Sequence, residues 1–177
     1  FKYIVSNTYN LYVLKRYLSD GKPHLIFISK WMYEVVKKDL YIGDNPYSIV
    51  PNHIDSSTYS FSRKNENHRL KVLVIRPFKS RKYAIDIVFK TILKFSEFKE
   101  FKNFDFTIIG KGKKWKKYKK KVNGISNVKM INKFLNPVEI KKYHDENGII
   151  FLPTRQDSQG VTMCEAMASG LVPLTSN

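Results

Sequence analysis

Two carboxylates near the C-terminal end of the sequence have a spacing that could bind the hydroxyl groups of a polar ligand. Asp157 and Glu165 are separated by seven residues, and Gly160 lies between them. An apolar run stopped by Pro153 predicts a buried strand before the first acid, and small and apolar residues ending at Gly170 predict a helix that carries the second. A helix that begins at the carboxyl end of a parallel strand is a common site for anions and nucleotides.

Two basic residues earlier in the chain could neutralise a diphosphate. Arg76 and Lys82 lie in a loop between a predicted strand, residues 70–75, and a predicted helix with an apolar stripe that begins at Ile85. A guanidinium and an ammonium group there could together stabilise the charge of a leaving phosphate. Arg81 is an additional candidate. Such a pair alone is typical of any basic surface, but its place in a strand–loop–helix unit favours phosphate contact.

A glycine pair, Gly110 and Gly112, follows another predicted strand, residues 104–109. Glycines there let the backbone approach a nucleotide closely, although a tight turn after a strand would need them equally. The helix expected next carries Trp115 and Tyr118 among lysines. Their helical spacing favours inward packing of the rings, so nucleic acid is an unlikely partner.

Strands alternate with helices along the whole chain, which predicts an α/β fold with a parallel, Rossmann-like sheet and flanking helices. Near the N-terminus, a helix capped by Ser29 is expected to bury Trp31, Val35 and Val36. Residues 56–68 are polar and unpatterned and are interpreted as an interdomain linker. The predicted domains are therefore residues 1–55 and 69–177.

Composition limits the class of protein. In 177 residues, 42% are apolar and 14% aromatic, which indicates a globular chain rather than a disordered one. One cysteine excludes an internal disulfide, and four scattered histidines make no metal-ligand spacing, so neither metal nor cofactor is expected. No membrane-spanning run or signal pattern is found, which predicts a cytoplasmic protein, with peripheral membrane attachment left open.

The formal net charge of +17 has two readings. Residues 111–121 contain eight lysines, and the remaining excess is spread along the chain. An AT-rich genome produces such a composition without any function. Alternatively, the charge attracts an anionic membrane surface or a phosphorylated substrate.

The segment D-S-Q-G-V-T-M-C-E-A-M-A-S-G, residues 157–170, resembles the acid-x7-Glu signature of retaining glycosyltransferases of the GT-B fold, family 4 type (glycosyl transferases group 1). The tail from Glu165 to Pro173 is similar to that family almost residue for residue. Two positions depart from its pattern: Asp157 replaces the usual glutamate, and Gln159 stands where an aromatic residue is common.

The resemblance implies a truncated C-terminal nucleotide-sugar-binding domain, preceded by the end of an acceptor-side domain and expected to be inactive alone. It implies transfer of a sugar from a nucleotide-diphosphate sugar to a glycan or lipid-linked acceptor, in surface polysaccharide or glycoconjugate synthesis. Glu165 would bind the ribose, Asp157 the donor sugar, and residues 132–134 would lie near the base. The implied catalytic residues are Arg76, Lys82 and Asp157, and the implied donor-binding residues are Gly110, Gly112, Asn132, Lys133, Phe134, Ser158, Gln159, Gly160, Val161 and Glu165.

Two other classes of function stay open at this point. A basic, non-enzymatic module that binds polyanions or anionic membrane would show salt-sensitive binding without nucleotide preference. A sugar-nucleotide epimerase of similar fold would be recognised by its product, although the sequence after Glu165 argues against it.

Overall fold

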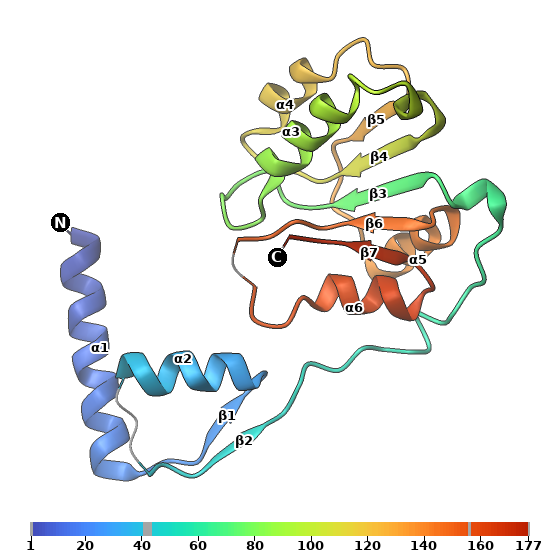
Figure 1. Cartoon of the computed structure of the whole chain (residues 1–177). Coiled ribbons are helices and arrows are strands. Elements are labelled where there is room, and N and C mark those ends of the chain that lie inside the picture. The colour runs from blue at the N-terminus through green and yellow to red at the C-terminus, as the bar shows by residue number, and fades with distance from the viewer. Residues whose placement is uncertain (1, 41–43, 156, 177) are drawn as a thin grey trace. The chain divides into compact units, whose positions relative to one another are not determined.

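The structure is a computed structural model that describes residues 2–40, 44–155 and 157–176 (Figure 1). Phe1 and Asn177, at the ends of the predicted domains, and Gln156, between Pro153 and Asp157, lie outside the described residues. The chain forms two compact units, residues 1–53 and 54–177, which are treated separately below. In the described ranges, no helix has both the length and the apolar content needed to cross a membrane.

The first unit consists of helix α1 (Lys2–Gly21), strand β1 (Leu25–Phe27), helix α2 (Lys30–Leu40) and strand β2 (Tyr47–Ile49). The two strands pair in parallel. The side chain of Ser29 accepts a hydrogen bond from the backbone N–H of Met32 at 3.2 Å, which confirms the predicted cap of α2.

The packing face of α2 differs in part from the predicted one. Val36 packs against the cluster of Leu18 and Phe27 as predicted, together with Met32, whereas Trp31 and Val35 are exposed. Both pairs are spaced four residues apart, so helical periodicity alone could not distinguish the two neighbouring stripes. The position of the strand beside the helix decides which stripe is buried.

The second unit is built on a five-stranded parallel sheet in the order β5-β4-β3-β6-β7. This sheet confirms the predicted α/β, Rossmann-like class. Successive side chains of the central strand β3 pack on opposite faces of the sheet. Val72 and Val74 belong to the hydrophobic core on one face, and Leu73 belongs to the core on the other. The strands are β3 (Lys71–Ile75), β4 (Asp105–Ile109), β5 (Val128–Ile131), β6 (Ile149–Phe151) and β7 (Val172–Leu174).

Helices cover both faces of this sheet (Figure 1). Helices α3 (Ile85–Phe95) and α4 (Trp115–Lys121) pack on one face, where the rings of Phe89 and Tyr118 stack. Helices α5 (Pro137–Glu146) and α6 (Val161–Ala168) pack on the other. Two 3-10 turns, η1 (Glu66–His68) and η2 (Lys99–Asn103), precede β3 and β4.

Helix α5 begins with the capping box that its sequence predicts. The side chain of Asn136 accepts from the backbone N–H of Glu139 at 2.9 Å, and the Glu139 carboxylate accepts from the N–H of Asn136 at 3.0 Å. Pro137 occupies the first turn, where its missing N–H costs nothing.

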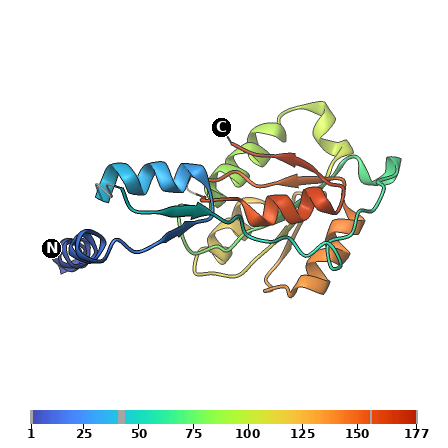
Figure 2. The same cartoon turned by 90° about the horizontal axis from the view of Figure 1, so that it is seen from below.

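Residues 54–68, here called the strap, run from the start of the second unit past the C-terminal end of α6 (Figure 2). Most of them were interpreted from sequence as a linker. In the structure the strap has fixed contacts with the second unit: Tyr59 is buried, and the Lys64 ammonium donates to the carbonyl of His144 at 2.7 Å. Contacts through single side chains and backbone atoms leave no periodic pattern in a sequence.

His144, on α5, is wholly buried under the strap. Its Nδ1 lies 3.1 Å from the hydroxyl of Ser169, and its Nε2 has no hydrogen-bond partner in the described part of the chain. Burial, together with the positive charges of Lys64 and Lys141, lowers the pKa of His144 to about 4, and the nearby Asp145 opposes this only in part.

We expect acid to destabilise the protein through His144. In the unfolded chain the histidine pKa returns to about 6.5, so the unfolded state binds a proton that the folded state rejects. The free energy of unfolding should therefore fall as the pH drops from about 6.5 towards 4, by up to ~3 kcal/mol. Thermal melts between pH 7.5 and 4 would measure this loss.

The matched variant for this test is His144→Gln, which should melt at a nearly constant temperature across the same pH window. Asp55 and Asp86, whose pKa values are about 2, lose their stabilising contacts only at lower pH. Equal slopes for the native protein and the variant would contradict the assignment to His144.

Candidate functional site

Arg76 directly follows the central strand β3 and is 7% exposed. Its Nη2 donates to the carbonyl of Leu152 at 3.4 Å, whereas its buried Nε has no partner among the described residues. Burial lowers the pKa of Arg76, and the negative charge of Asp157 opposes that effect. A buried guanidinium with an unused donor is costly unless an anion arrives to accept from it.

The two glycines after β4 hold the neighbouring loop close to Arg76. A Cβ at Gly110 would lie 2.0 Å from the carbonyl oxygen of Arg76. Gly112 has φ +151°, and a Cβ there would lie 2.5 Å from the carbonyl carbon of Phe78. The N–H of Phe78 donates to the carbonyl of Lys111 at 2.8 Å. Both glycines thus have a packing role that exists before any ligand binds.

Lys82 is exposed, and the structure brings it to the same aromatic ring as Arg76. The ammonium of Lys82 lies 4.9 Å from the ring centre of Tyr83, and the guanidinium carbon of Arg76 lies 5.9 Å from it. Cations at these distances are attracted by the ring face. Tyr83 therefore gathers the two predicted phosphate-binding side chains.

The acidic loop, residues 153–160, is fastened to the loop after β3. Arg155 makes two hydrogen bonds of 2.7 Å to the carboxylate of Asp86 at the start of α3, and its backbone N–H donates to the carbonyl of Lys82 at 3.0 Å. Hydrogen bonding to Arg155 lowers the pKa of Asp86 to about 2. Sequence reasoning missed this pair, because its members lie 69 residues apart and no local pattern connects them.

Asp157 is directed at its own loop. Its carboxylate accepts from the N–H of Gly160 at 3.0 Å and from that of Gln159 at 3.5 Å. The resemblance implies that these two residues bind the donor. Local bonds of this kind are typical of aspartate, whose short side chain reaches the backbone two or three residues onward. Ser158 and Val161 lie half-buried beside them.

Gly160 has φ +69° and ψ +44°, a left-handed conformation that favours glycine, and it begins helix α6. Glu165 lies one turn further and is half-buried. Burial, and after it the negative charge of Glu165, raise the pKa of Tyr59 to about 12; sequence reasoning did not select this residue of the strap. Burial raises the pKa of Glu165, and the hydroxyl of Tyr59 acts in the opposite direction.

The predicted base-proximal residues follow β5, at the edge of the sheet. Asn132, Lys133 and Phe134 are all exposed, and Phe134 is 80% exposed. Lys133 forms an ion pair with Glu139, the capping residue of α5, which raises the pKa of Lys133.

Parallel strands bring these groups to one edge of the sheet. The loops after β3, β4, β5 and β6 carry Arg76, Gly110, Asn132 and the acidic loop, and all four follow the carboxyl end of their strand. This is the edge at which open α/β sheets bind ligands. The structure therefore places the predicted residues on a common edge, with Glu165 on the helix that follows the acidic loop.

A sequence model of the family described as glycosyl transferases group 1 matches residues 69–177. The match covers the whole sheet and every predicted site residue. The chain belongs to this family. No curated protein sequence matches the chain significantly.

Solved structures with the same fold include several glycosyltransferases. A Rickettsia africae glycosyltransferase has a TM-score of 0.72 at 12% identity, over 93% of this chain and 48% of its own. The sucrose-phosphate synthase of Thermosynechococcus elongatus has a TM-score of 0.71 at 12% identity, over 93% and 43%. A TarM variant of S. aureus, solved with UDP, has a TM-score of 0.66 at 14% identity, over 91% and 31%.

These similarities and the family match confirm the expectation of a GT-B glycosyltransferase chain. The chain spans less than half the length of each of the three structures. The described residues contain no cluster of three or more His, Cys, Asp or Glu side chains that could hold a metal ion.

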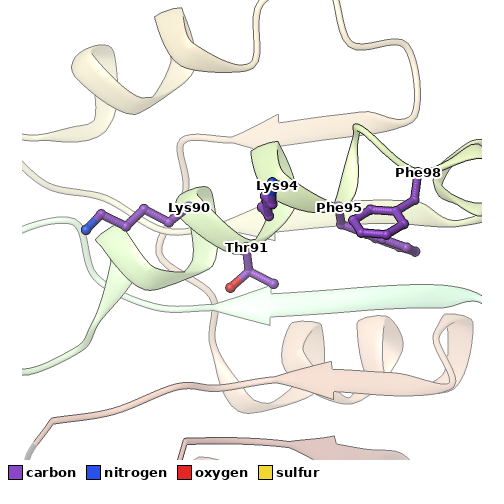
Figure 3. Close-up of a pocket in the computed structure, with 5 residues that line it drawn as sticks. All are labelled: Lys90, Thr91, Lys94, Phe95 and Phe98. Atoms are coloured by element: carbon purple, nitrogen blue, oxygen red, sulfur yellow. The ribbon is translucent and has the colours of Figure 1, made fainter.

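A surface hollow of about 450 Å³ lies away from this sheet edge (Figure 3). It is formed by the outer side of α3 and the turn after it, with Phe95 and Phe98 beside the lysines. Lys94 forms a 2.6 Å ion pair with Glu97 there. None of the candidate site residues lines this hollow, so the hollow is not part of the candidate site.

Proposed function

We propose that this chain is the donor-binding part of a retaining glycosyltransferase. The enzyme would move a sugar from a nucleotide-diphosphate sugar to a hydroxyl of a glycan or lipid-linked acceptor, in surface polysaccharide or glycoconjugate synthesis. The observation that carries the proposal is Arg76, a buried guanidinium at the carboxyl edge of the sheet whose Nε lacks a partner among the described residues. Family membership supports the same assignment.

In the proposed reaction, the bond between the anomeric carbon and the diphosphate breaks, and a bond to the acceptor oxygen forms on the same face of the sugar. The proton of the acceptor hydroxyl passes to the released diphosphate. Arg76 and Lys82 stabilise the charge that develops on the leaving phosphate. Their two positive charges supply what a metal ion supplies elsewhere, so the proposal includes no metal or other cofactor.

The remaining residues bind the donor. Asp157 exchanges its bonds to the loop N–H groups for a hydroxyl of the donor sugar, which leaves those N–H groups free for the diphosphate. Glu165 accepts from the ribose hydroxyls, and backbone groups of residues 132–134 face the base. The exchange at Asp157 is favourable only if sugar and diphosphate arrive together, because a lost loop bond must be replaced.

We also propose three further properties that the sequence analysis predicted: the domain limits 1–55 and 69–177, a cytoplasmic location, and attraction to anionic membrane. The lysine-rich helix α4 supports the last of these, since its five non-aromatic residues are all exposed lysines. Because the chain spans only part of its structural relatives, we assign sugar transfer to the whole protein and donor binding to this chain.

Calorimetric titration of UDP, GDP and ADP at two salt concentrations tests the proposal, with the native chain and Glu165→Ala side by side. We expect saturable binding that prefers one base and is about tenfold weaker in the variant, from the loss of one or two hydrogen bonds to a charged group. Binding of RNA or anionic vesicles without nucleotide preference, and with strong salt dependence, would favour the basic binding module instead.

A further inference from the structure

Lys82 is carried by a strained turn, residues 80–84, here called the lysine turn. The N–H of Lys82 donates to the hydroxyl of Ser80 at 3.1 Å, and the N–H of Ala84 donates to the carbonyl of Arg81 at 3.0 Å. Ala84 has φ +48° and ψ +29°, a left-handed conformation that is costly for a residue with a Cβ. A strained backbone of this kind persists where neighbouring groups hold it, so the lysine turn needs contacts from elsewhere in the chain.

Those contacts come from the two residues after Pro153. The Nη1 of Arg155 donates to the carbonyl of Arg81 at 2.9 Å. The backbone N–H of Arg155 donates to the carbonyl of Lys82 at 3.0 Å, and the hydroxyl of Thr154 donates to the same carbonyl at 3.3 Å. Two consecutive carbonyls of the lysine turn are therefore held by residues that lie just before Asp157.

Arg155 and Thr154 are themselves fixed on two sides. The guanidinium of Arg155 makes two parallel bonds of 2.7 Å to the carboxylate of Asp86, on the first turn of α3. Bidentate pairs of this kind set the orientation of the guanidinium as well as its distance. On the other side, the N–H of Thr154 donates to the hydroxyl of Ser176 at 3.0 Å, and that hydroxyl donates to the carbonyl of Thr154 at 2.7 Å.

The two cations that meet at the lysine turn have different surroundings. Both terminal nitrogens of Arg155 are engaged by Asp86, whose carboxylate balances the guanidinium charge. The ammonium of Lys82 instead lies 4.9 Å from the ring centre of Tyr83, which the guanidinium of Arg76 also approaches. A ring face attracts a cation without neutralising it, so Lys82 keeps its charge for an anion.

We propose that Arg155 is a positioning residue for the diphosphate: held by Asp86, it fixes the lysine turn and so keeps Lys82 beside Arg76, where the phosphate binds. A long, flexible lysine side chain binds more tightly when its backbone is already fixed, because less freedom is lost on binding. The inference rests on the proposed function, since it assumes that Lys82 contacts the leaving phosphate. It adds that phosphate binding depends on a residue two positions before Asp157.

The first experiment measures the binding of a nucleoside diphosphate to Arg155→Gln and to Asp86→Ala. The probes are whichever of UDP, GDP and ADP binds tightest, and the corresponding nucleoside. We expect each variant to weaken the diphosphate about fivefold and the nucleoside less than twofold. Arg69→Gln is the control, because it breaks a pair with Glu66 in the segment before β3 and should change neither affinity.

Asp86→Ala distinguishes positioning from a simple effect of charge. If Arg155 acted only through its positive charge, or bound the phosphate directly, then removal of the carboxylate would free that charge and strengthen diphosphate binding. If the pair positions the lysine turn, both variants weaken binding, although one removes a positive charge and the other a negative one.

A double-mutant cycle tests whether Arg155 acts through Lys82. Lys82→Met should weaken the diphosphate about tenfold, as for the loss of a hydrogen bond between charged groups. Arg155→Gln added to Lys82→Met should weaken it less than twofold further, because no ammonium group is left to position. A purely structural role for Arg155, or a contact of its own with the phosphate, would give the full fivefold loss in both backgrounds.

Three results would overturn the inference while the proposed function stands: diphosphate affinity unchanged in Arg155→Gln, tighter or unchanged binding in Asp86→Ala, or a full loss from Arg155→Gln in the Lys82→Met background. Each counts against Arg155 alone when Lys82→Met weakens the diphosphate in the otherwise native chain. If Lys82→Met has no effect, or the native chain binds no diphosphate, the phosphate role of Lys82 fails, and the inference with it.

A second readout needs no nucleotide. Amide hydrogen exchange, followed by NMR of the full chain, reports on the bond from the N–H of Ala84 to the carbonyl of Arg81. This amide should exchange about tenfold faster in Arg155→Gln and in Asp86→Ala, and at the native rate in Arg69→Gln. An unchanged rate in the first two variants would show that the pair does not hold the lysine turn and would overturn the inference.

Discussion

Arg76→Met should weaken the binding of nucleoside diphosphates about ten- to hundredfold, while binding of the corresponding nucleoside stays within about twofold. A hydrogen bond between two charged groups in a buried place contributes about 1.5 to 3 kcal/mol, and the nucleoside has no phosphate to lose. Methionine has a similar length and no charge, so the loop should keep its shape. Titration calorimetry with both ligands measures the difference.

The same substitution should stabilise the ligand-free chain, by about 1 to 2 kcal/mol in the free energy of unfolding. Arg76 is buried with an unpartnered Nε in the described part of the chain, and an apolar side chain of similar volume removes that desolvation cost. Lys102→Met, which removes the same charge from an exposed position before β4, is the control and should change neither quantity. Destabilisation of Arg76→Met together with unchanged diphosphate affinity would assign Arg76 a purely structural role.

Gly110→Ala should destabilise the second unit by about 4 kcal/mol or more and prevent its folding in many conditions. The new Cβ would lie 2.0 Å from the carbonyl oxygen of Arg76 and 2.9 Å from its carbonyl carbon. These are backbone atoms of a loop that follows the central strand, so neither a rotamer change nor a small shift relieves the overlap. Urea unfolding followed by Trp115 fluorescence, in a Trp31→Phe background, reports on the second unit alone.

Gly124→Ala is the matched control for this prediction. Gly124 has φ +87°, and a Cβ there would meet nothing within 4 Å. Its substitution adds only the strain of a left-handed alanine, about 1 kcal/mol. Similar stability losses in the two variants would show that the loop after β3 adapts to the methyl group. The Gly-x-Gly pair would then serve a bound nucleotide rather than the packing of the two loops.

The sequence by itself determined the order of strands and helices in the second unit, the parallel sheet and the family. Each of these features depends on residues that are close together in the sequence. Apolar runs bounded by turn residues predicted β3, β4 and β6, and Asn136, Pro137 and Glu139 predicted the start of α5. The spacing of Asp157 and Glu165 was visible for the same reason. Local hydrogen bonding and periodicity need no knowledge of distant residues.

Only the tertiary structure decided how the candidate side chains are used. Arg155 pairs with Asp86 across 69 residues of sequence, and the strap brings Lys64 to the carbonyl of His144. The burial of Arg76 likewise depends on every loop packed around the end of β3. Such contacts are set by how the strands stack and where the loops cross. Single polar side chains that meet in this way add no periodicity to the sequence, so only the folded chain reveals them.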